Sequence, residues 1–342
     1  MKATSRMIVS KYIFKAFISS IVLACHGVYI NVDKSWLTFD DQSATRLCDA
    51  NHNYYTNPGN TKAIGVINNK KTANDSLRRR LTEVIQSCNA NIGMSVFHIE
   101  KKETISIKGH DRFPMLSVYK FPIALTVLDL VDKKKIRMKK QIPILPDLIH
   151  PYEKELILSV FPGGKARIED LLSLMLVHGS NTACDILLKE IGGPQVANRY
   201  MRKIGIDSMA IINTEAEIQK SPDVKYKNWC TPNEIVRLLL TSFERKILSA
   251  KSYSFLWTKM TETNTGSNRL KGLLPKEATI AHRTGTSSDV YNDVGIITLP
   301  NNEHVAIAVF MSDAKDEPKK AEQIIARIGK CVWDHYCKSG LI

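Results

Sequence analysis

The segment Asp293–Met311, DVGIITLPNNEHVAIAVFM, decides the fold class of this chain. It holds two runs rich in Val, Ile and Ala, Asp293–Leu299 and His304–Met311, separated by a short polar break with Pro and Asn. Apolar runs of this length bounded by turn residues are typical of β-strands. Because Thr279–Arg283 is a further strand-like run just upstream, we predict three strands near the end of the chain.

A second group of strands is predicted far upstream. Apolar and polar residues alternate in IGMSVFHIE (Ile92–Glu100) and in KETISIKG (Lys102–Gly109), and this period of two predicts a β-hairpin. Helical patterns cover Leu77–Cys88, before the hairpin, and Pro318–Tyr336, after the last strand. We therefore expect one antiparallel sheet of five strands from both ends of the chain, flanked by the N- and C-terminal helices.

Helices fill the middle of the chain. Their predicted ranges are Ser117–Asp132, Ile168–Val177, Asn181–Ile191, Gln195–Ile204 and Pro232–Phe243. The fold class is thus α+β, with an α/β lobe formed by residues 73–116 and 270–342 and an all-helical lobe of residues 117–269. A cleft between two such lobes is a natural place for an active site.

The N-terminus has the pattern of an export signal. Basic residues precede the apolar run Ala16–Cys25, and no acidic residue occurs before Asp33. Residues 1–25 are predicted to be a signal or a lipoprotein signal, because Cys25 follows Val22-Leu23-Ala24. The polar residues 26–72 are predicted to be a poorly ordered tether. We expect an exported protein, either periplasmic or lipid-anchored at Cys25 in a bacterial envelope, with no other contact with a membrane.

Charge and cysteine content narrow the function classes. The net charge is +14, but the basic residues lie in scattered runs without zinc-finger spacing or interleaved aromatic residues, so nucleic acid is not an expected partner. None of the seven cysteines forms a C-x-x-C motif, and we predict no metal site and no cofactor. Some cysteines could pair in an exported protein, whereas Cys184 is predicted to be free and buried on an apolar helix face.

Ser117 and Lys120 carry the first chemical signal. They are three residues apart at a predicted helix start, so their side chains share one face. A serine hydroxyl needs a base to act as a nucleophile, and a desolvated lysine can be that base.

Two further segments could complete such a site. In AHRTGTSS, Arg283 ends a strand and could hold a carboxylate, with Thr284 and Thr286 beside it, and Gly285 allows close approach of a ligand. In the long irregular segment NTEAEIQKSPDVKYKNW, Glu215 is a candidate base, and Gln219 could help to hold a water molecule.

Together, in this order and spacing, these segments resemble the class A serine β-lactamases, most closely the branch with extended-spectrum cephalosporinases. The resemblance runs from about Asn74 to the C-terminus and includes MLSVYKFPIAL, NTACDILLKEIGG, TETNTGSNRLKGLLP and NDVGIITLP. It implies a monomeric enzyme that takes a small-molecule β-lactam as substrate. Ser117 would be the acylated nucleophile, Lys120 its partner and Glu215 the activator of the deacylating water. The backbone N–H groups of Ser117 and Thr286 would form an oxyanion hole, and Arg283 would bind the substrate carboxylate.

The second motif departs from the family. Gly179-Ser180-Asn181 stands where the family has Ser-Asp-Asn, so Asn181 is retained for substrate binding but the hydroxyl that relays a proton to the lactam nitrogen is missing. Either Ser180 reaches the site through a backbone shift, or water replaces the relay, or the site no longer hydrolyses lactams. If the relay is what is missing, Gly179→Ser should raise turnover.

Two more departures concern the loop that carries the predicted base. Asn213 and Ala216 stand where the family commonly has an Arg that pins this loop and a Pro, so the loop is expected to be held differently. Two rival functions remain at this point. One is a penicillin-binding or sensor protein that acylates and turns over slowly or not at all. The other is a DD-peptidase-like acyltransferase.

Overall fold

The computed structural model describes residues 61–244 and 247–338. The described residues from Ile64 onward form one compact unit. The predicted signal, Cys25 and most of the predicted tether lie outside the described residues. Along the described part of the chain, no helix combines the length and the apolar character that a membrane span requires.

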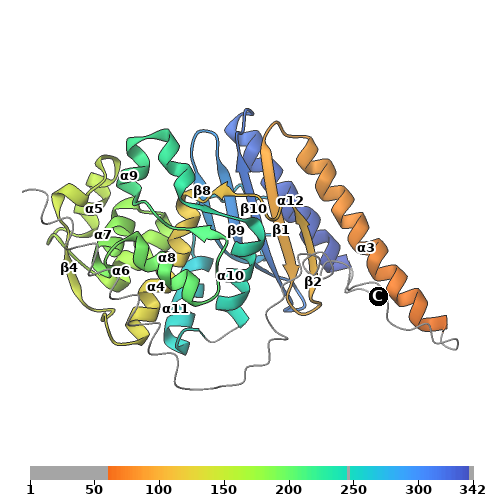
Figure 1. Cartoon of the computed structure of the whole chain (residues 1–342), viewed down its shortest axis with the longest axis horizontal. Helices are drawn as coiled ribbons and strands as arrows, with labels where there is room; N and C mark the ends of the chain where they lie inside the picture. Colours follow the sequence, from red (N-terminus) through yellow and green to blue (C-terminus); the bar gives the residue numbers. More distant parts are fainter. Residues whose placement is uncertain (1–60, 245–246, 339–342) are drawn as a thin grey trace, which may run out of the picture. The chain divides into compact units, whose positions relative to one another are not determined.

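A five-stranded antiparallel sheet forms the centre of this unit, as the sequence predicts (Figure 1). The strand order is β2-β1-β10-β9-β8, with neighbouring strands antiparallel. The strands are β1 (Asn91–His98), β2 (Glu103–Ile107), β8 (Thr279–Thr286), β9 (Tyr291–Thr298) and β10 (His304–Ser312). The hairpin β1–β2 therefore joins the C-terminal strands through the β1–β10 pair, in which Met94 lies opposite Val309.

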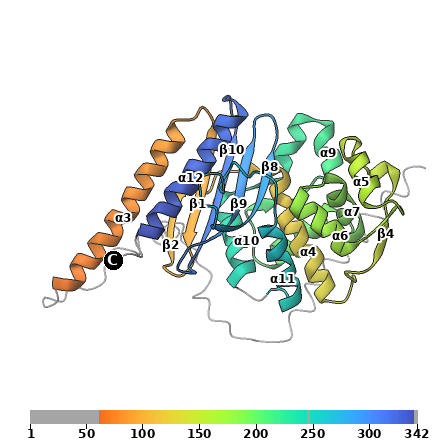
Figure 2. The same cartoon turned by 180° about the vertical axis from the view of Figure 1, so that it is seen from behind.

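Both faces of this sheet are buried. Along β10, Val305, Ile307 and Val309 pack into one apolar cluster, whereas Ala306, Ala308 and Phe310 pack into the other. Strand residues alternate between the two faces, so an uninterrupted apolar run is what a strand covered on both sides requires. The first cluster lies under α3 (Thr61–Gln86) and α12 (Pro318–Lys338), as Figure 2 shows from behind.

The other face of the sheet borders the helical region. The buried helix α4 (Lys120–Asp132) lies at its centre, directly after the 3-10 turn η2 (Leu116–Tyr119). Around it lie α5 (Lys154–Val160), α6 (Ile168–Ser173), the π-helical turn η5 (Leu174–His178), α7 (Asn181–Ile191), α8 (Pro194–Lys203), α9 (Glu215–Lys220), η6 (Pro222–Lys227), α10 (Pro232–Glu244) and α11 (Ala250–Thr261). Two short turns, η3 (Pro146–Leu148) and η4 (Pro151–Glu153), precede α5.

Two small sheets complete the described residues. One contains β3 (Phe113–Pro114), β7 (Trp229–Cys230) and β6 (Met209–Ala210), and the other pairs β4 (Gln141–Pro143) with β5 (Lys165–Arg167). In the three-stranded sheet, β3 precedes η2 and α4, β6 precedes α9, and β7 follows α9. This sheet therefore joins the segment before η2 to both ends of the loop that carries Glu215.

The structure corrects several predicted boundaries. Helix α3 begins at Thr61 and so extends into the predicted tether of residues 26–72. Helix α10, assigned to the helical lobe, packs against β1 and β10, because its apolar side chains belong to the cluster on that face of the sheet. The predicted helix Ile168–Val177 is divided into α6 and the π-helical turn η5. Helix α11 was not predicted at all.

The cysteines of the described region are unpaired. Cys88, Cys184, Cys230, Cys331 and Cys337 are free thiols, so the suggestion that some cysteines pair does not hold for these five. Cys184 is fully buried on α7, which confirms its predicted place on an apolar face.

Candidate active site

The nucleophile candidate lies on a tightly turned segment. Leu116 has a left-handed backbone (φ +48), which is unusual for a residue with a side chain, and Ser117 follows it on η2. Lys120, the first residue of α4, is fully buried, and its Nζ donates a hydrogen bond of 2.6 Å to Ser117 Oγ. The two residues that the sequence places on one face therefore meet.

Glu215 reaches the same lysine from another part of the chain. It is the buried residue of the short helix α9, and its Oε1 lies 2.5 Å from Lys120 Nζ. A capping box starts α9: the Thr214 hydroxyl accepts from Glu217 N–H, and the Glu217 carboxylate accepts from Thr214 N–H. The Lys120 ammonium thus contacts both the Ser117 hydroxyl and the Glu215 carboxylate.

Polar contacts hold the loop of Glu215. Asp185 on α7 accepts from the backbone N–H of Glu215 at 2.8 Å and of Ala216 at 2.9 Å. Its carboxylate also lies 3.1 Å from His150 Nε2, and His150 is buried. Burial alone would lower the pKa of His150, but the hydrogen bond and charge of Asp185 outweigh burial and raise it.

A buried amide holds the start of the same loop. Asn228 Oδ1 accepts from Ile212 N–H and Asn213 N–H, and its Nδ2 donates to Asn213 O. These contacts hold the loop at Asn213, where the resemblance leads us to expect a different anchor from the Arg common in the family. Asp185, His150 and Asn228 were not predicted as site residues, because no local sequence pattern marks them.

Asn181 connects the second motif to the reacting group. Its Oδ1 accepts a hydrogen bond from Lys120 Nζ, and its Nδ2 donates to the hydroxyl of Tyr152. The side chain of Gln219 donates to the same Tyr152 hydroxyl at 2.9 Å, and Tyr152 is exposed. Gln219, predicted to support a water molecule, is therefore bound to the tyrosine at the exposed side of the site.

Ser180 does not face the reacting group as the relay hypothesis requires. Its hydroxyl donates to Glu153 Oε2 at 2.6 Å and accepts from Ala183 N–H at 3.1 Å, as the N-cap of α7. The Glu153 carboxylate also accepts from the N–H groups of Asn181 and Thr182. Because a helix N-terminus leaves N–H groups unpaired, serine and carboxylate cap α7 together. The predicted relay role of Ser180 is corrected to a structural one.

Strand β8 carries the predicted substrate-binding residues Arg283, Thr284, Gly285 and Thr286. Arg283 is 1% exposed, and its Nη1 donates to Thr265 Oγ1 at 3.1 Å. Within the described residues no carboxylate lies at ion-pair distance from Arg283, and burial lowers its pKa to about 10. The hydroxyl of Thr284 shares a hydrogen bond of 2.7 Å with Thr265.

Gly285 and Thr286 bring the end of β8 against the nucleophile turn. A Cβ at Gly285 would lie 2.4 Å from the carbonyl oxygen of Met115, so only glycine allows this approach. Arg269, which the sequence did not single out, donates to Gly285 O, Asn292 O and Thr286 Oγ1 from a buried position. The end of β8 thus packs against the turn η2 that carries Ser117.

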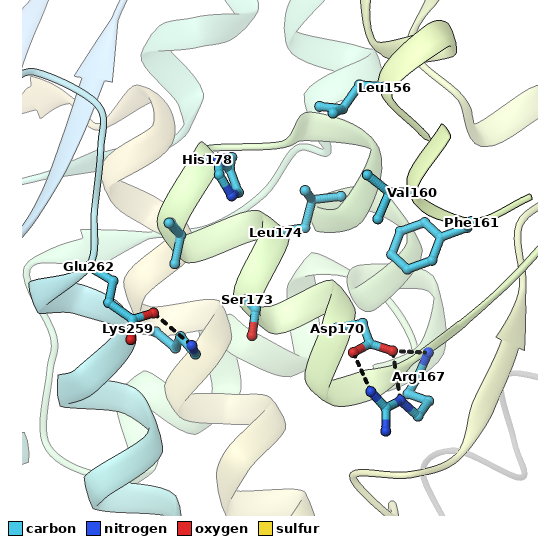
Figure 3. A pocket seen from close by; sticks show the side chains of 11 residues that line it. Leu156, Val160, Phe161, Arg167, Asp170, Ser173, Leu174, His178, Lys259 and Glu262 are labelled. Carbon is cyan, nitrogen blue, oxygen red and sulfur yellow. Dashed lines mark hydrogen bonds and ion pairs between the residues drawn. The ribbon is translucent and has the colours of Figure 1, made fainter. Parts of the chain in front are cut away.

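A separate cavity of about 690 Å³ lies between α5, α6, η5 and the end of α11 (Figure 3). Leu156, Val160 and Phe161 form its apolar part, and the ion pairs Arg167–Asp170 and Lys259–Glu262 lie at its edge. Neither Ser117, Lys120 nor Glu215 lines it. Among the described residues no cluster of His, Cys, Asp or Glu could hold a metal ion.

Comparison of the sequence and structure with known proteins identifies the family. The profile of the β-lactamase enzyme family matches residues 76–336. The chain belongs to this family. It is 39% identical over 271 residues to β-lactamase VEB-1 of Pseudomonas aeruginosa, which covers 77% of this chain and 91% of that relative. It is 30% identical to the extended-spectrum β-lactamase PER-1 of the same species, over 77% of this chain and 88% of PER-1.

A solved structure supports the same assignment. A class A β-lactamase from Bacteroides cellulosilyticus is 29% identical, with a TM-score of 0.71, over 78% of this chain and 99% of that one. The chain is thus a class A serine β-lactamase, and the predicted fold class and family are confirmed.

Proposed function

We propose that this β-lactamase hydrolyses β-lactam antibiotics through an acyl-enzyme on Ser117. The observation that supports this most is a single buried ammonium, that of Lys120, which contacts both the Ser117 hydroxyl and the Glu215 carboxylate. Proton transfer between groups already in contact needs no rearrangement of the site. The serine is therefore poised for activation.

Acylation uses these three groups in sequence. Glu215 takes a proton from Lys120, and the neutral amine then takes the proton of Ser117 as its Oγ attacks the lactam carbonyl carbon. As the C–N bond breaks, Lys120 gives that proton to the nitrogen, and Glu215 returns its own proton to Lys120. The backbone N–H groups of Ser117 and Thr286 would stabilise the negative oxygen, a contribution of about 3 kcal/mol for each such donor.

Deacylation assigns a second task to Glu215. Its carboxylate accepts a proton from a water molecule, whose oxygen attacks the ester carbon, and Ser117 leaves with a proton from Lys120. The transfer from Glu215 to Lys120 then restores the ion pair. A positioned general base of this kind contributes about 10²- to 10⁴-fold to rate. The buried position of α9's Glu215 favours this role over a solvated one.

Arg283 would bind the carboxylate that β-lactams carry, with Thr284 beside it. A buried guanidinium with no acidic partner at ion-pair distance in the described residues is expected to have an anionic ligand. We propose further that the protein is exported to a bacterial envelope, on the basis of the basic and apolar N-terminal pattern. We also propose that it acts as a monomer, as its resemblance to the class A family implies.

Mass spectrometry after mixing with penicillin tests the proposal. We expect the adduct to form and to disappear, with return of the unmodified mass and release of the opened lactam. A persistent adduct would favour a penicillin-binding or sensor protein, and the absence of any adduct would contradict the nucleophile. Turnover of a D-Ala-D-Ala peptide without lactam hydrolysis would favour the acyltransferase.

A further inference from the structure

Gly179, the residue where the family has a serine, lies directly under a charged side chain. Its backbone is left-handed (φ +78), and it ends the π-helical turn η5 before α7. A Cβ built on Gly179 would lie 2.9 Å from Arg283 Nη2 and 3.6 Å from Nη1. The guanidinium therefore occupies the volume that a side chain at position 179 would fill.

Arg283 has little freedom to move away. It is 1% exposed, and its Nη1 is bound to Thr265 Oγ1, which also shares a hydrogen bond with Thr284. Its Nε is buried and has no hydrogen-bond partner. A side chain added at position 179 would thus press on a group that is enclosed by β8 and by Thr265.

The pair lies at the reacting centre. Two residues after Gly179, Asn181 accepts a hydrogen bond from Lys120, and the charge of Glu215 acts on Arg283. The guanidinium consequently faces the same group of side chains from the side on which the family places its relay hydroxyl.

We propose that Gly179 and Arg283 form one functional unit, in which the guanidinium replaces a side chain at position 179 and positions the substrate on the side of the departing nitrogen. Arg283 stays charged and donates hydrogen bonds only; the proton on the nitrogen comes from Lys120. A lysine at position 283 lacks the planar fork and would leave the space over Gly179 unfilled. This inference rests on the proposed function and deepens it.

The proposal reverses one expectation from the sequence. Restoring serine alone, in Gly179→Ser, should lower turnover rather than raise it, because the new side chain meets Arg283. When Gly179→Ser is combined with Arg283→Lys, the smaller lysine side chain leaves space for the serine hydroxyl.

A double-mutant cycle tests the pairing. The proteins are wild type, Gly179→Ser, Arg283→Lys and the double variant, each measured for kcat and KM on a chromogenic cephalosporin and for thermal unfolding without substrate. We expect each single change to lower kcat/KM by about 10-fold or more and the double variant to recover to within about 3-fold of wild type, a coupling well outside the additivity of independent sites. Backbone strain at the left-handed position is the same with Arg or Lys and cancels in the cycle.

The possible outcomes separate this inference from the proposed function. Coupling in both kcat/KM and thermal unfolding supports the unit, whereas additive effects in kcat/KM overturn it, including when unfolding alone is coupled. Gly179→Ala adds the Cβ without a hydroxyl; a wild-type kcat/KM in that variant also overturns the steric argument. If wild type forms no penicillin adduct, the proposed function fails and the inference fails with it.

Discussion

Ser117 and Lys120 stand on elements embedded in the apolar core, whereas Glu215 stands on a loop held by polar contacts. In α4 every residue from Lys120 to Leu128 is buried, but in α9 the buried residue is Glu215. The loop is instead held by Asp185, Asn228 and the capping box of Thr214. Apolar packing, which does not depend on pH, therefore positions the nucleophile Ser117. The base Glu215 is positioned instead by polar groups, which can change protonation state or lose a hydrogen-bond partner.

The largest loss of turnover is expected at Ser117, which is positioned by the apolar core. Ser117→Ala removes the nucleophile, so we expect no penicillin adduct and a loss of turnover on the order of 10⁶-fold, as in other serine hydrolases. Electrospray mass spectrometry and a chromogenic cephalosporin measure the two quantities. Retained turnover in this variant would mean that another group attacks the lactam.

Glu215→Gln tests the role of the base in the loss of the acyl-enzyme. The amide can accept neither the proton of Lys120 nor that of water, so the adduct should form more slowly than in wild type and then persist, because deacylation slows by about 10²- to 10⁴-fold. The lifetime of the adduct mass measures this. Glu277→Gln, at an exposed position between α11 and β8, is the matched control and should leave the adduct lifetime unchanged. A short-lived adduct in Glu215→Gln would assign the base elsewhere.

Asp185→Ala breaks the polar clamp itself. The N–H groups of buried Glu215 and of exposed Ala216 lose their acceptor, and a donor left unsatisfied in a buried position costs about 1–3 kcal/mol. We expect the free energy of unfolding to fall by about 3 kcal/mol in urea titrations, and deacylation to slow more than acylation. Glu262→Ala removes an exposed ion pair and should change the free energy by about 0–1 kcal/mol. Equal effects of the two substitutions would argue against the clamp.

The smallest effect is a pH dependence at His150. Its pKa is raised in the folded protein, so its stabilising interaction with Asp185 is fully present below the ordinary histidine pKa of about 6.5 and is lost as pH rises through the raised value. The groups facing it are Asp185, Glu153 and Gln219. Thermal unfolding should therefore show wild type losing its advantage over His150→Gln as pH increases. His110→Gln, on the surface, is the control; the same trend there would remove the assignment.

Much of the fold follows from local pattern. The strands β1, β2, β9 and β10 lie within a few residues of the predicted runs. Alternation at period two marked β1 and β2, and uninterrupted apolar runs marked β9 and β10; both are properties of neighbouring residues. Ser117 and Lys120 could also be paired from their spacing, since residues three apart share a helix face. By contrast, Asp185, Asn228, Arg269 and Glu153 were missed, because each acts on backbone groups more than a dozen residues away.

The sequence by itself determined the strands and helices, with them the α+β class, and the serine–lysine pair, since these depend on patterns within single segments. Only the tertiary structure decided that Ser180 caps α7 with Glu153 and that Arg283 covers Gly179. The physical reason is that hydrogen-bond partners and occupied volume depend on distances between segments. No periodicity along the chain encodes where a guanidinium from β8 meets the end of η5.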